Sequence, residues 1–126
     1  MTPKFYKCQE CGQIIAVVQA SACTPVCCGQ KMQEISANTT DAAQEKHVPV
    51  ISTEGNIVTV KVGSVDHPMT EAHLIEWICL VTKQGVQRKV LSAGSAPCAQ
   101  FALLDGDEAV EAYAYCNLHG LWKSEA

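Results

Sequence analysis

Five of the chain's eight cysteines fall within its first 28 residues, in a segment with few apolar residues. A segment of fewer than about 40 residues rarely buries enough apolar surface to fold alone, and it usually needs a metal ion or disulfides. The cysteines lie in the stretches KCQECG and CTPVCCG, on either side of a strand-like run at residues 13–20. Residues 1–36 therefore predict a small domain that is held together by a metal ion.

Metal binding is favoured over disulfide bonding by the compartment that the sequence predicts. The start of the chain, MTPKFYKCQEC, has no long apolar region behind a basic one, so it does not predict a secretory signal. We therefore expect a cytoplasmic protein, in which cysteines stay reduced and free to bind metals.

The net charge of −4 argues against general binding to nucleic acids or anionic membranes. No apolar run approaches the roughly 20 residues that a membrane span requires.

The cysteines of this segment form two close pairs, each followed by a glycine. Cys8 and Cys11 form a C-x-x-C motif, whereas Cys27 and Cys28 are adjacent. In such motifs both thiolates can face one metal ion, and the glycine permits the tight turn that follows them. Four thiolates predict a tetrahedral site, which suits zinc and iron equally on ligand type alone. Cys23 is an alternative fourth ligand. The sequence pattern does not decide between Cys23 and a cysteine of the adjacent pair.

The rest of the chain predicts an all-β domain behind a linker. Residues 37–46, ANTTDAAQEK, are polar and lack strand patterning, so they predict a linker. Residues 47–126 hold seven short strand-like runs separated by turn signals, and alternating apolar residues predict one buried face. Seven such strands favour an antiparallel β-sandwich of immunoglobulin type. The predicted strands are residues 47–51, 56–62, 73–82, 86–91, 99–104, 109–116 and 120–123.

The chain's four histidines all fall near the ends of these predicted strands. His47 begins one, His67 and His73 flank a turn, and His119 follows the strand that ends in Cys116. A single histidine is more often a packed or surface residue than a ligand, but several strand ends of a sandwich gather at one edge. Structural zinc takes four ligands, whereas four imidazoles and a thiolate make five. Five such donors with one position left open suit iron, and an open position implies chemistry.

The sequence resembles desulfoferrodoxin, the two-iron class of superoxide reductase, over essentially its whole length. The resemblance rests on YKCQECG, VCCG, EKHVPVI, KVGSVDHPM, HLIEWI and YCNLHGLWK, which occur in the family's order. It implies a rubredoxin- or desulforedoxin-like iron domain, followed by an immunoglobulin-like sandwich with a catalytic iron site. It implies that the first iron is held by Cys8, Cys11, Cys27 and Cys28. It implies that the second iron is held by His47, His67, His73 and His119, with Cys116 as the axial ligand.

The resemblance also implies an activity and partners. Superoxide would bind opposite the axial sulfur and be reduced to hydrogen peroxide, in a detoxification reaction that counters oxidative stress. Glu45 and Lys46 would border that position, Glu45 as a sixth ligand of the resting ferric iron and Lys46 as a guide for the anion. An external donor such as rubredoxin would re-reduce the iron, and the protein would be a homodimer. The family pattern assigns no role to Cys23, Cys79 or Cys98.

Two other functions compete with superoxide reduction. One is a non-catalytic iron electron carrier, or a zinc-stabilised binding module, in which the histidine group is incidental. The other is a superoxide dismutase, which would evolve oxygen and would not consume a reductant stoichiometrically. Residues 37–126 contain six basic and eleven acidic residues, so their net charge is −5. An anionic substrate would therefore need local positive charge at the site.

Overall fold

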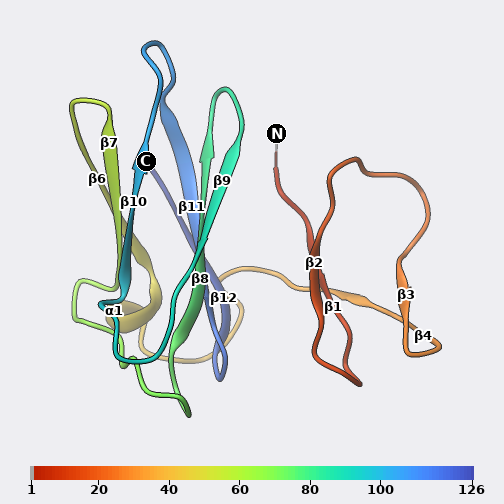
Figure 1. Cartoon of the computed structure of the whole chain (residues 1–126). Coiled ribbons are helices and arrows are strands. Elements are labelled where there is room, and N and C mark those ends of the chain that lie inside the picture. Colours follow the sequence, from red (N-terminus) through yellow and green to blue (C-terminus); the bar gives the residue numbers. More distant parts are fainter. Residues whose placement is uncertain (1) are drawn as a thin grey trace. The chain divides into compact units, whose positions relative to one another are not determined.

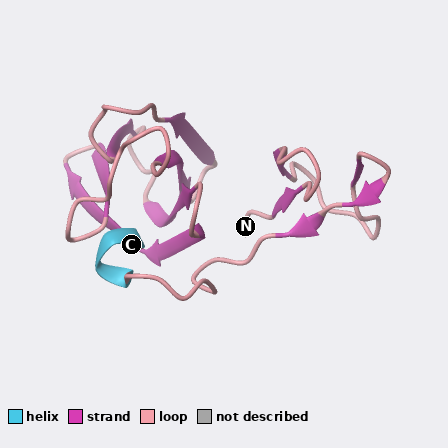
Figure 2. Ribbon diagram, turned by 90° about the horizontal axis from the view of Figure 1, so that it is seen from below, coloured by secondary structure: helices cyan, strands magenta, loops and turns pink. Residues whose placement is uncertain are grey.

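The computed structural model describes residues 2–126, and the chain divides into two compact units, Met1–Ser36 and Ala37–Ala126. Strands dominate both units (Figure 1). The one helix among the described residues is the four-residue α1, Gln44–His47, drawn in cyan in Figure 2. The predicted all-β class is therefore confirmed. No helix in this part of the chain is long and apolar enough to cross a membrane.

The first unit is a small three-stranded sheet with a separate hairpin. The sheet has the order β2-β1-β5, and the hairpin pairs β3 with β4. Its buried apolar residues are few, so this unit has little core with which to hold its loops. The strands are β1 Phe5–Lys7, β2 Ile14–Ala16, β3 Val26–Cys27, β4 Gln30–Lys31 and β5 Gln33–Glu34.

The apolar run at residues 13–20 forms a shorter strand than the sequence predicts. β2 contains only Ile14–Ala16, which pair antiparallel with β1. The amide of Val17 still donates to the carbonyl of Lys4, but Val18 is fully exposed. The small sheet offers no second layer against which the remaining apolar side chains of the run can pack, and the strand ends accordingly.

The second unit is an antiparallel sandwich of seven strands in two sheets. One sheet has the order β10-β7-β6 and the other β12-β11-β8-β9. The predicted immunoglobulin-like architecture is thereby confirmed. The strands are β6 Pro49–Glu54, β7 Ile57–Val62, β8 Ile75–Thr82, β9 Val86–Val90, β10 Cys98–Ala102, β11 Ala109–Cys116 and β12 Gly120–Glu125.

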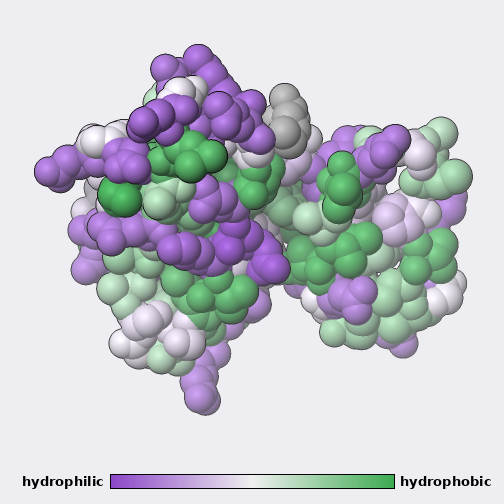
Figure 3. All heavy atoms as spheres, turned by 45° about the horizontal axis from the view of Figure 1, so that its top comes forward, coloured by the Kyte–Doolittle hydropathy of each residue, from purple (hydrophilic) through white to green (hydrophobic). Residues whose placement is uncertain are grey.

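Alternating residues of the two sheets fill the space between them. On β7 the buried Val58, Val60 and Val62 alternate with the more exposed Thr59 and Lys61, as the sequence pattern predicts. β8 and β11 contribute buried residues from the opposite sheet, and the core cluster runs on to Cys116 at the end of β11. The core therefore reaches the edge of the sandwich at which the predicted second site lies. Hydrophilic and apolar residues are intermixed on the face seen in Figure 3, as on an ordinary protein surface.

His47 does not begin a strand, contrary to the prediction for residues 47–51. It ends helix α1, and β6 begins at Pro49. A residue before proline is pushed out of the helical region, and Val48 is extended, with φ −71° and ψ 122°. The predicted strand at 73–82 likewise starts later, at Ile75, because His73 forms an isolated bridge with Thr70.

The segment 37–46, which the sequence predicts to be a linker, makes specific contacts within the second unit. The Asn38 side chain donates to the carbonyl of Lys123 and accepts from its amide. The amide of Asn38 also donates to the carbonyl of Leu121. These bonds satisfy backbone groups on the outer edge of β12. Helix α1 then completes the segment and leads into His47.

Candidate metal centres

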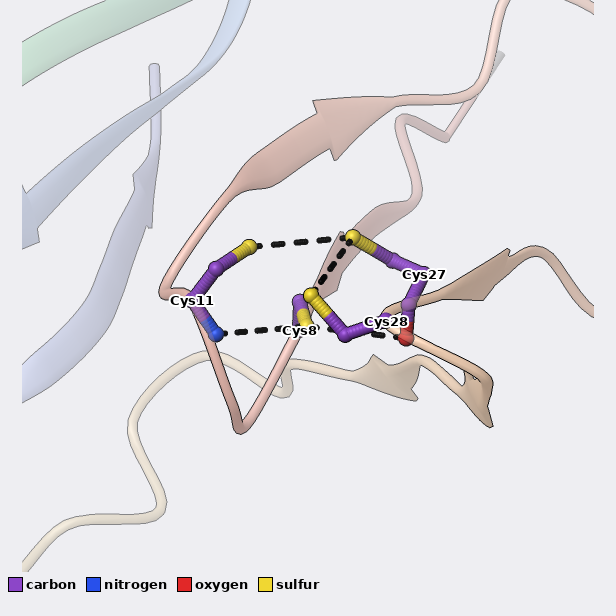
Figure 4. Close-up of side chains that lie close together, drawn as sticks. All are labelled: Cys8, Cys11, Cys27 and Cys28. Atoms are coloured by element: carbon purple, nitrogen blue, oxygen red, sulfur yellow. Dashed lines mark hydrogen bonds between the residues drawn. The ribbon is translucent and has the colours of Figure 1, made fainter.

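The first unit brings four cysteine sulfurs together, those of Cys8, Cys11, Cys27 and Cys28 (Figure 4). The Sγ atoms of Cys11 and Cys27 are 3.7 Å apart, and those of Cys27 and Cys28 are 3.9 Å apart. A disulfide would need about 2.05 Å. Sulfurs that share one ion at about 2.3 Å in a tetrahedron lie roughly 3.8 Å apart. The spacing therefore fits one tetrahedrally bound metal ion.

The local backbone geometry directs the sulfurs of the adjacent Cys27 and Cys28. Cys28 has φ +53° and is followed by Gly29 at +72°. Two consecutive residues with positive φ reverse the chain sharply, so the neighbouring sulfurs can turn toward the same point. The amide of Cys11 points toward the sulfur of Cys8, 3.5 Å away, as expected for a C-x-x-C loop.

The same contacts set the acidity of the thiols. The bond from the Cys11 amide lowers the pKa of Cys8 to about 6, because it stabilises the thiolate. Cys27 shares protons with Cys8 and Cys11, and this raises its pKa to about 12. The four groups cannot all ionise next to one another unless a cation replaces the shared protons. The chemistry of the donor set thus also fits a divalent metal ion.

The remaining cysteines lie outside this group. Cys23, the rival fourth ligand, is exposed, and its amide bonds to the hydroxyl of Ser21. Cys79 is buried in the middle of β8, and Cys98 is half-buried at the start of β10. The structure therefore brings Cys27 and Cys28, rather than Cys23, to the C-x-x-C pair.

The second unit brings the histidines together with Cys116. Potential ligand atoms of His47, His67, His73 and Cys116 all lie within 4.8 Å of one another. His119 adjoins them: its Nδ1 is 3.1 Å from Nε2 of His47 and 3.9 Å from the Cys116 sulfur. The five residues come from the end of α1, the β7–β8 connection, the end of β11 and the β11–β12 turn.

Two of these imidazoles have a fixed tautomer. The Nδ1 of His47 is 2.7 Å from the carbonyl oxygen of Ala43, and that of His67 is 2.6 Å from the carbonyl oxygen of Pro68. A carbonyl only accepts, so each Nδ1 carries the proton and each Nε2 presents a lone pair. The two Nε2 atoms are nevertheless 3.2 Å apart. Two lone pairs at that distance repel each other unless a cation lies between them.

His73 gives a second indication that this group binds a cation. Its Nε2 is buried and has no hydrogen-bond partner among the described residues. An unpaired buried polar atom is costly unless a ligand satisfies it. The donor set therefore fits a metal ion bound by Nε2 of His47, His67 and His73 and by Nδ1 of His119. Cys116, which is fully buried at the end of β11, supplies the sulfur.

Burial keeps three of the histidines and the cysteine uncharged before a metal ion binds. It lowers the pKa values of His47 and His73, and it lowers that of His67 to about 4. These three imidazoles are therefore neutral and available as ligands at physiological pH. Burial also raises the pKa of the Cys116 thiol, so its ionisation requires a bound cation.

Glu45 and Lys46 precede His47 on α1, and both side chains are exposed. Neither belongs to the ligand group. Their backbone is fixed from the β7–β8 connection, where the Val65 amide donates to the Glu45 carbonyl at 2.9 Å. Gly63 permits this approach: a Cβ there would collide with the Val65 carbonyl and lie 2.7 Å from the Glu45 carbonyl oxygen and 2.8 Å from Lys46 Cα.

Two further residues hold the site together, and sequence reasoning assigns neither of them to it. The Asn117 side chain accepts from the amide of Leu74 and donates to the carbonyl of Ala72. It therefore holds the backbone on both sides of His73. Trp122 contacts two histidines. Their closeness to Cys116 and His119 in the sequence is the only signal that points to them.

Comparisons with known proteins agree with this geometry. The family described as "Desulfoferrodoxin, N-terminal domain" matches residues 2–35, and the family described as "Desulfoferrodoxin" matches residues 39–125. A desulfoferrodoxin homolog from Archaeoglobus fulgidus is 53% identical over 121 residues, which cover 96% of this chain and 95% of that protein.

Solved structures show the same likeness. The superoxide reductase from Treponema pallidum superposes with a TM-score of 0.85 at 38% identity, covering 99% of this chain and 100% of that one. A superoxide reductase (1Fe-SOR) from Giardia intestinalis covers 65% of this chain and 97% of its own, with a TM-score of 0.56 and 38% identity.

Proposed function

This chain belongs to the desulfoferrodoxin family, and on that premise we propose that it reduces superoxide to hydrogen peroxide at the histidine–cysteine site of its second unit. The observation that carries the proposal is the arrangement of the imidazoles. Buried nitrogen lone pairs of His47, His67 and His73 converge with the Cys116 thiol, and no proton is available to bridge His47 and His67. Such a group favours a bound metal ion.

The proposed metal ion at this site is iron. Four imidazoles and one thiolate leave a sixth position open on an octahedral ion, whereas structural zinc is complete with four ligands. A ferrous ion held by these residues would supply the single electron that superoxide needs, and the Cys116 thiolate would increase its tendency to donate that electron. The protein residues would hold the ion in place. Apart from the Cys116 thiolate, the ligands that they provide are neutral. The proposed ligands are His47, His67, His73, His119 and Cys116.

The overall reaction combines superoxide with one electron and two protons to give hydrogen peroxide. We propose that the exposed Lys46 attracts the anion, against the −5 net charge of residues 37–126. Four neutral imidazoles and one thiolate leave the ferrous site with a charge of about +1. The exposed Glu45 is proposed to act as the sixth ligand in the resting ferric state. Solvent water supplies the protons.

We propose that the four cysteines of the first unit hold a second iron ion in a tetrahedral site. The sulfur spacings near 3.8 Å support a tetrahedral metal ion, and the family resemblance supports iron over zinc. The two groups of ligands belong to separate compact units, which supports an auxiliary role for the first iron in catalysis.

Three further proposals concern the protein's surroundings. An external donor of the rubredoxin kind returns the electron, because reduction of superoxide oxidises the iron at each turnover. The protein works in the cytoplasm, where reducing conditions suit eight free cysteines. It forms a homodimer, a proposal that rests on the family resemblance alone.

Metal analysis combined with a turnover assay tests the proposed function. We expect two iron atoms per chain, a visible absorption spectrum, no acid-labile sulfide, and consumption of superoxide when a reductant is supplied. A colourless protein that contains zinc and leaves superoxide untouched would contradict the proposal and favour a binding module. Iron at both sites without consumption of superoxide would instead favour an electron carrier.

A further inference from the structure

Trp122 contacts two members of the histidine–cysteine group. Trp122 is on β12, is 2% exposed and pairs in register with Ala114 of β11. Its indole ring stacks on the imidazole of His47, with ring centroids 4.9 Å apart and planes inclined by 25°. Its Nε1–H donates to the backbone carbonyl of His119 at 3.1 Å. One rigid side chain thus connects residues that are 72 positions apart in the sequence.

Each contact restrains a different part of the site. His47 is held on one edge by the bond from its Nδ1 to the Ala43 carbonyl, and the indole covers a face of the ring. Together they fix the direction of the His47 Nε2 lone pair. His119 lies in the short turn between β11 and β12, where the indole bond fixes the peptide that carries the imidazole.

These two restraints act on the same interatomic distance. The Nδ1 of His119 is 3.1 Å from Nε2 of His47, so both ligand atoms face one point. A small rotation of either ring would turn its lone pair away from that point and weaken its metal bond, because a metal ion binds along the lone pairs. A general packing residue would fill space beneath the site without a directed bond to a ligand residue.

We propose that Trp122 is a positioning residue, which sets the geometry of His47 and His119 toward the metal ion of the second site. The proposal rests on the proposed function, since it assumes that these histidines are ligands. It assigns the indole N–H a specific part, namely to hold the β11–β12 turn in the conformation that directs His119 inward. Loss of that N–H should loosen the metal site even when the aromatic ring remains.

The test compares tryptophan variants of the iron-loaded full-length protein. Trp122→Phe keeps a ring against His47 and removes the hydrogen-bond donor, whereas Trp122→Leu removes both. Trp77→Phe is the matched control, because Trp77 is also a buried β-strand tryptophan and stacks on Tyr115 at 5.6 Å. Iron release is followed with a ferrous chelator, and the visible band and melting temperature are recorded for each variant.

Residues that orient metal ligands typically contribute 10- to 100-fold to metal affinity. We expect release from the second site to be about tenfold faster in Trp122→Phe and faster still in Trp122→Leu, each with a shifted visible band. Trp77→Phe should release iron at close to the native rate. The release phase of the four-cysteine site should be unchanged in every variant, and it serves as an internal standard.

Equal release rates and identical visible bands for Trp122→Phe and Trp77→Phe would overturn the proposal, even if Trp122→Phe melts at a lower temperature. That pattern would show that Trp122 only packs. The chelator assay contains no superoxide, so its outcome is independent of catalysis. A native protein that fails to reduce superoxide would count against the proposed function and would leave the release comparison valid.

Discussion

The Nε2 atoms of His47 and His67 lie 3.2 Å apart, while each ring donates its Nδ1 proton to a backbone carbonyl. Both facing nitrogens therefore present lone pairs, and a neutral pair of rings has no hydrogen atom to share between them. Protonation would relieve the contact, but burial lowers both pKa values. A bound cation resolves this conflict.

The four-cysteine site should be separable from catalysis. Cys8→Ser replaces one sulfur ligand and should remove one iron atom per chain, while superoxide reduction stays largely intact. Cys23→Ser is the control, because the exposed Cys23 lies outside the group and its loss should leave both iron atoms in place. Metal analysis and a superoxide assay measure the two effects. A folded Cys8→Ser protein that keeps its second iron but has no activity would show that the first centre takes part in the catalytic step.

Replacement of Cys116 by serine should abolish the activity. The hydroxyl is a poor, mostly neutral donor compared with a thiolate, so the sulfur-to-iron charge-transfer band should disappear, together with nearly all turnover. Cys79→Ser places a serine at an equally buried cysteine of β8 and controls for the cost of a buried hydroxyl. The visible spectra of both variants show whether the Cys116 sulfur binds the iron. An unchanged band in Cys116→Ser would mean that this sulfur is not a ligand.

Lys46 should speed the arrival of superoxide. One unit charge at about 6 Å in an effective dielectric of about 40 changes a rate by roughly tenfold. We therefore expect Lys46→Ala to slow the second-order reaction by several-fold to tenfold, whereas Lys46→Arg retains most of it. The rate for Lys46→Ala should also fall less steeply with ionic strength, since part of the attraction is gone.

Pulse radiolysis of the reduced protein over a series of salt concentrations measures both quantities. If native protein and Lys46→Ala share the same rate and the same salt dependence, Lys46 has no part in the reaction and is an ordinary solvated side chain.

Gly63 should be needed to hold α1 in place. A Cβ at Gly63 would collide with backbone atoms of Val65, Glu45 and Lys46, none of which is a flexible side-chain end. Gly63→Ala should therefore lower the stability by more than about 2 kcal/mol and slow the reaction with superoxide. Gly106→Ala is the matched control, since Gly106 also has a positive φ, of +89°, but has open space around it.

Thermal melts and reaction rates separate the two variants. Gly106→Ala should lose only about 1–2 kcal/mol, the cost of a left-handed conformation, and should react at the native rate. If both variants lose the same stability and keep the same rate, Gly63 does not position the segment that carries Glu45 and Lys46.

Sequence periodicity predicted the sandwich strands well where one face is buried. The alternation of Val58, Val60 and Val62 matches their burial on β7, and residues 109–116 form β11 as predicted. The element that contains His47 was predicted wrongly, because the apolar pattern of HVPV outweighed the effect of Pro49 on the residue before it.

The ligand group was predictable as a set of residue types, but its geometry was not. The orientation of the His47 and His67 rings depends on bonds to the backbone carbonyls of Ala43 and Pro68. Every residue has a backbone carbonyl, so the sequence does not indicate which of them will form such a bond. The contacts of Trp122 are equally hidden, because a tryptophan in a strand reads as a core residue whether or not it touches a ligand.

The yield of products from superoxide tests the central claim most directly. The native protein, reduced beforehand and mixed anaerobically with superoxide, should form one hydrogen peroxide per electron withdrawn from the iron of the second site, with no oxygen released. The ferric visible band should appear in step with the peroxide. Release of oxygen at about half the amount of superoxide consumed, without net oxidation of the protein, would identify a dismutase and would contradict the account.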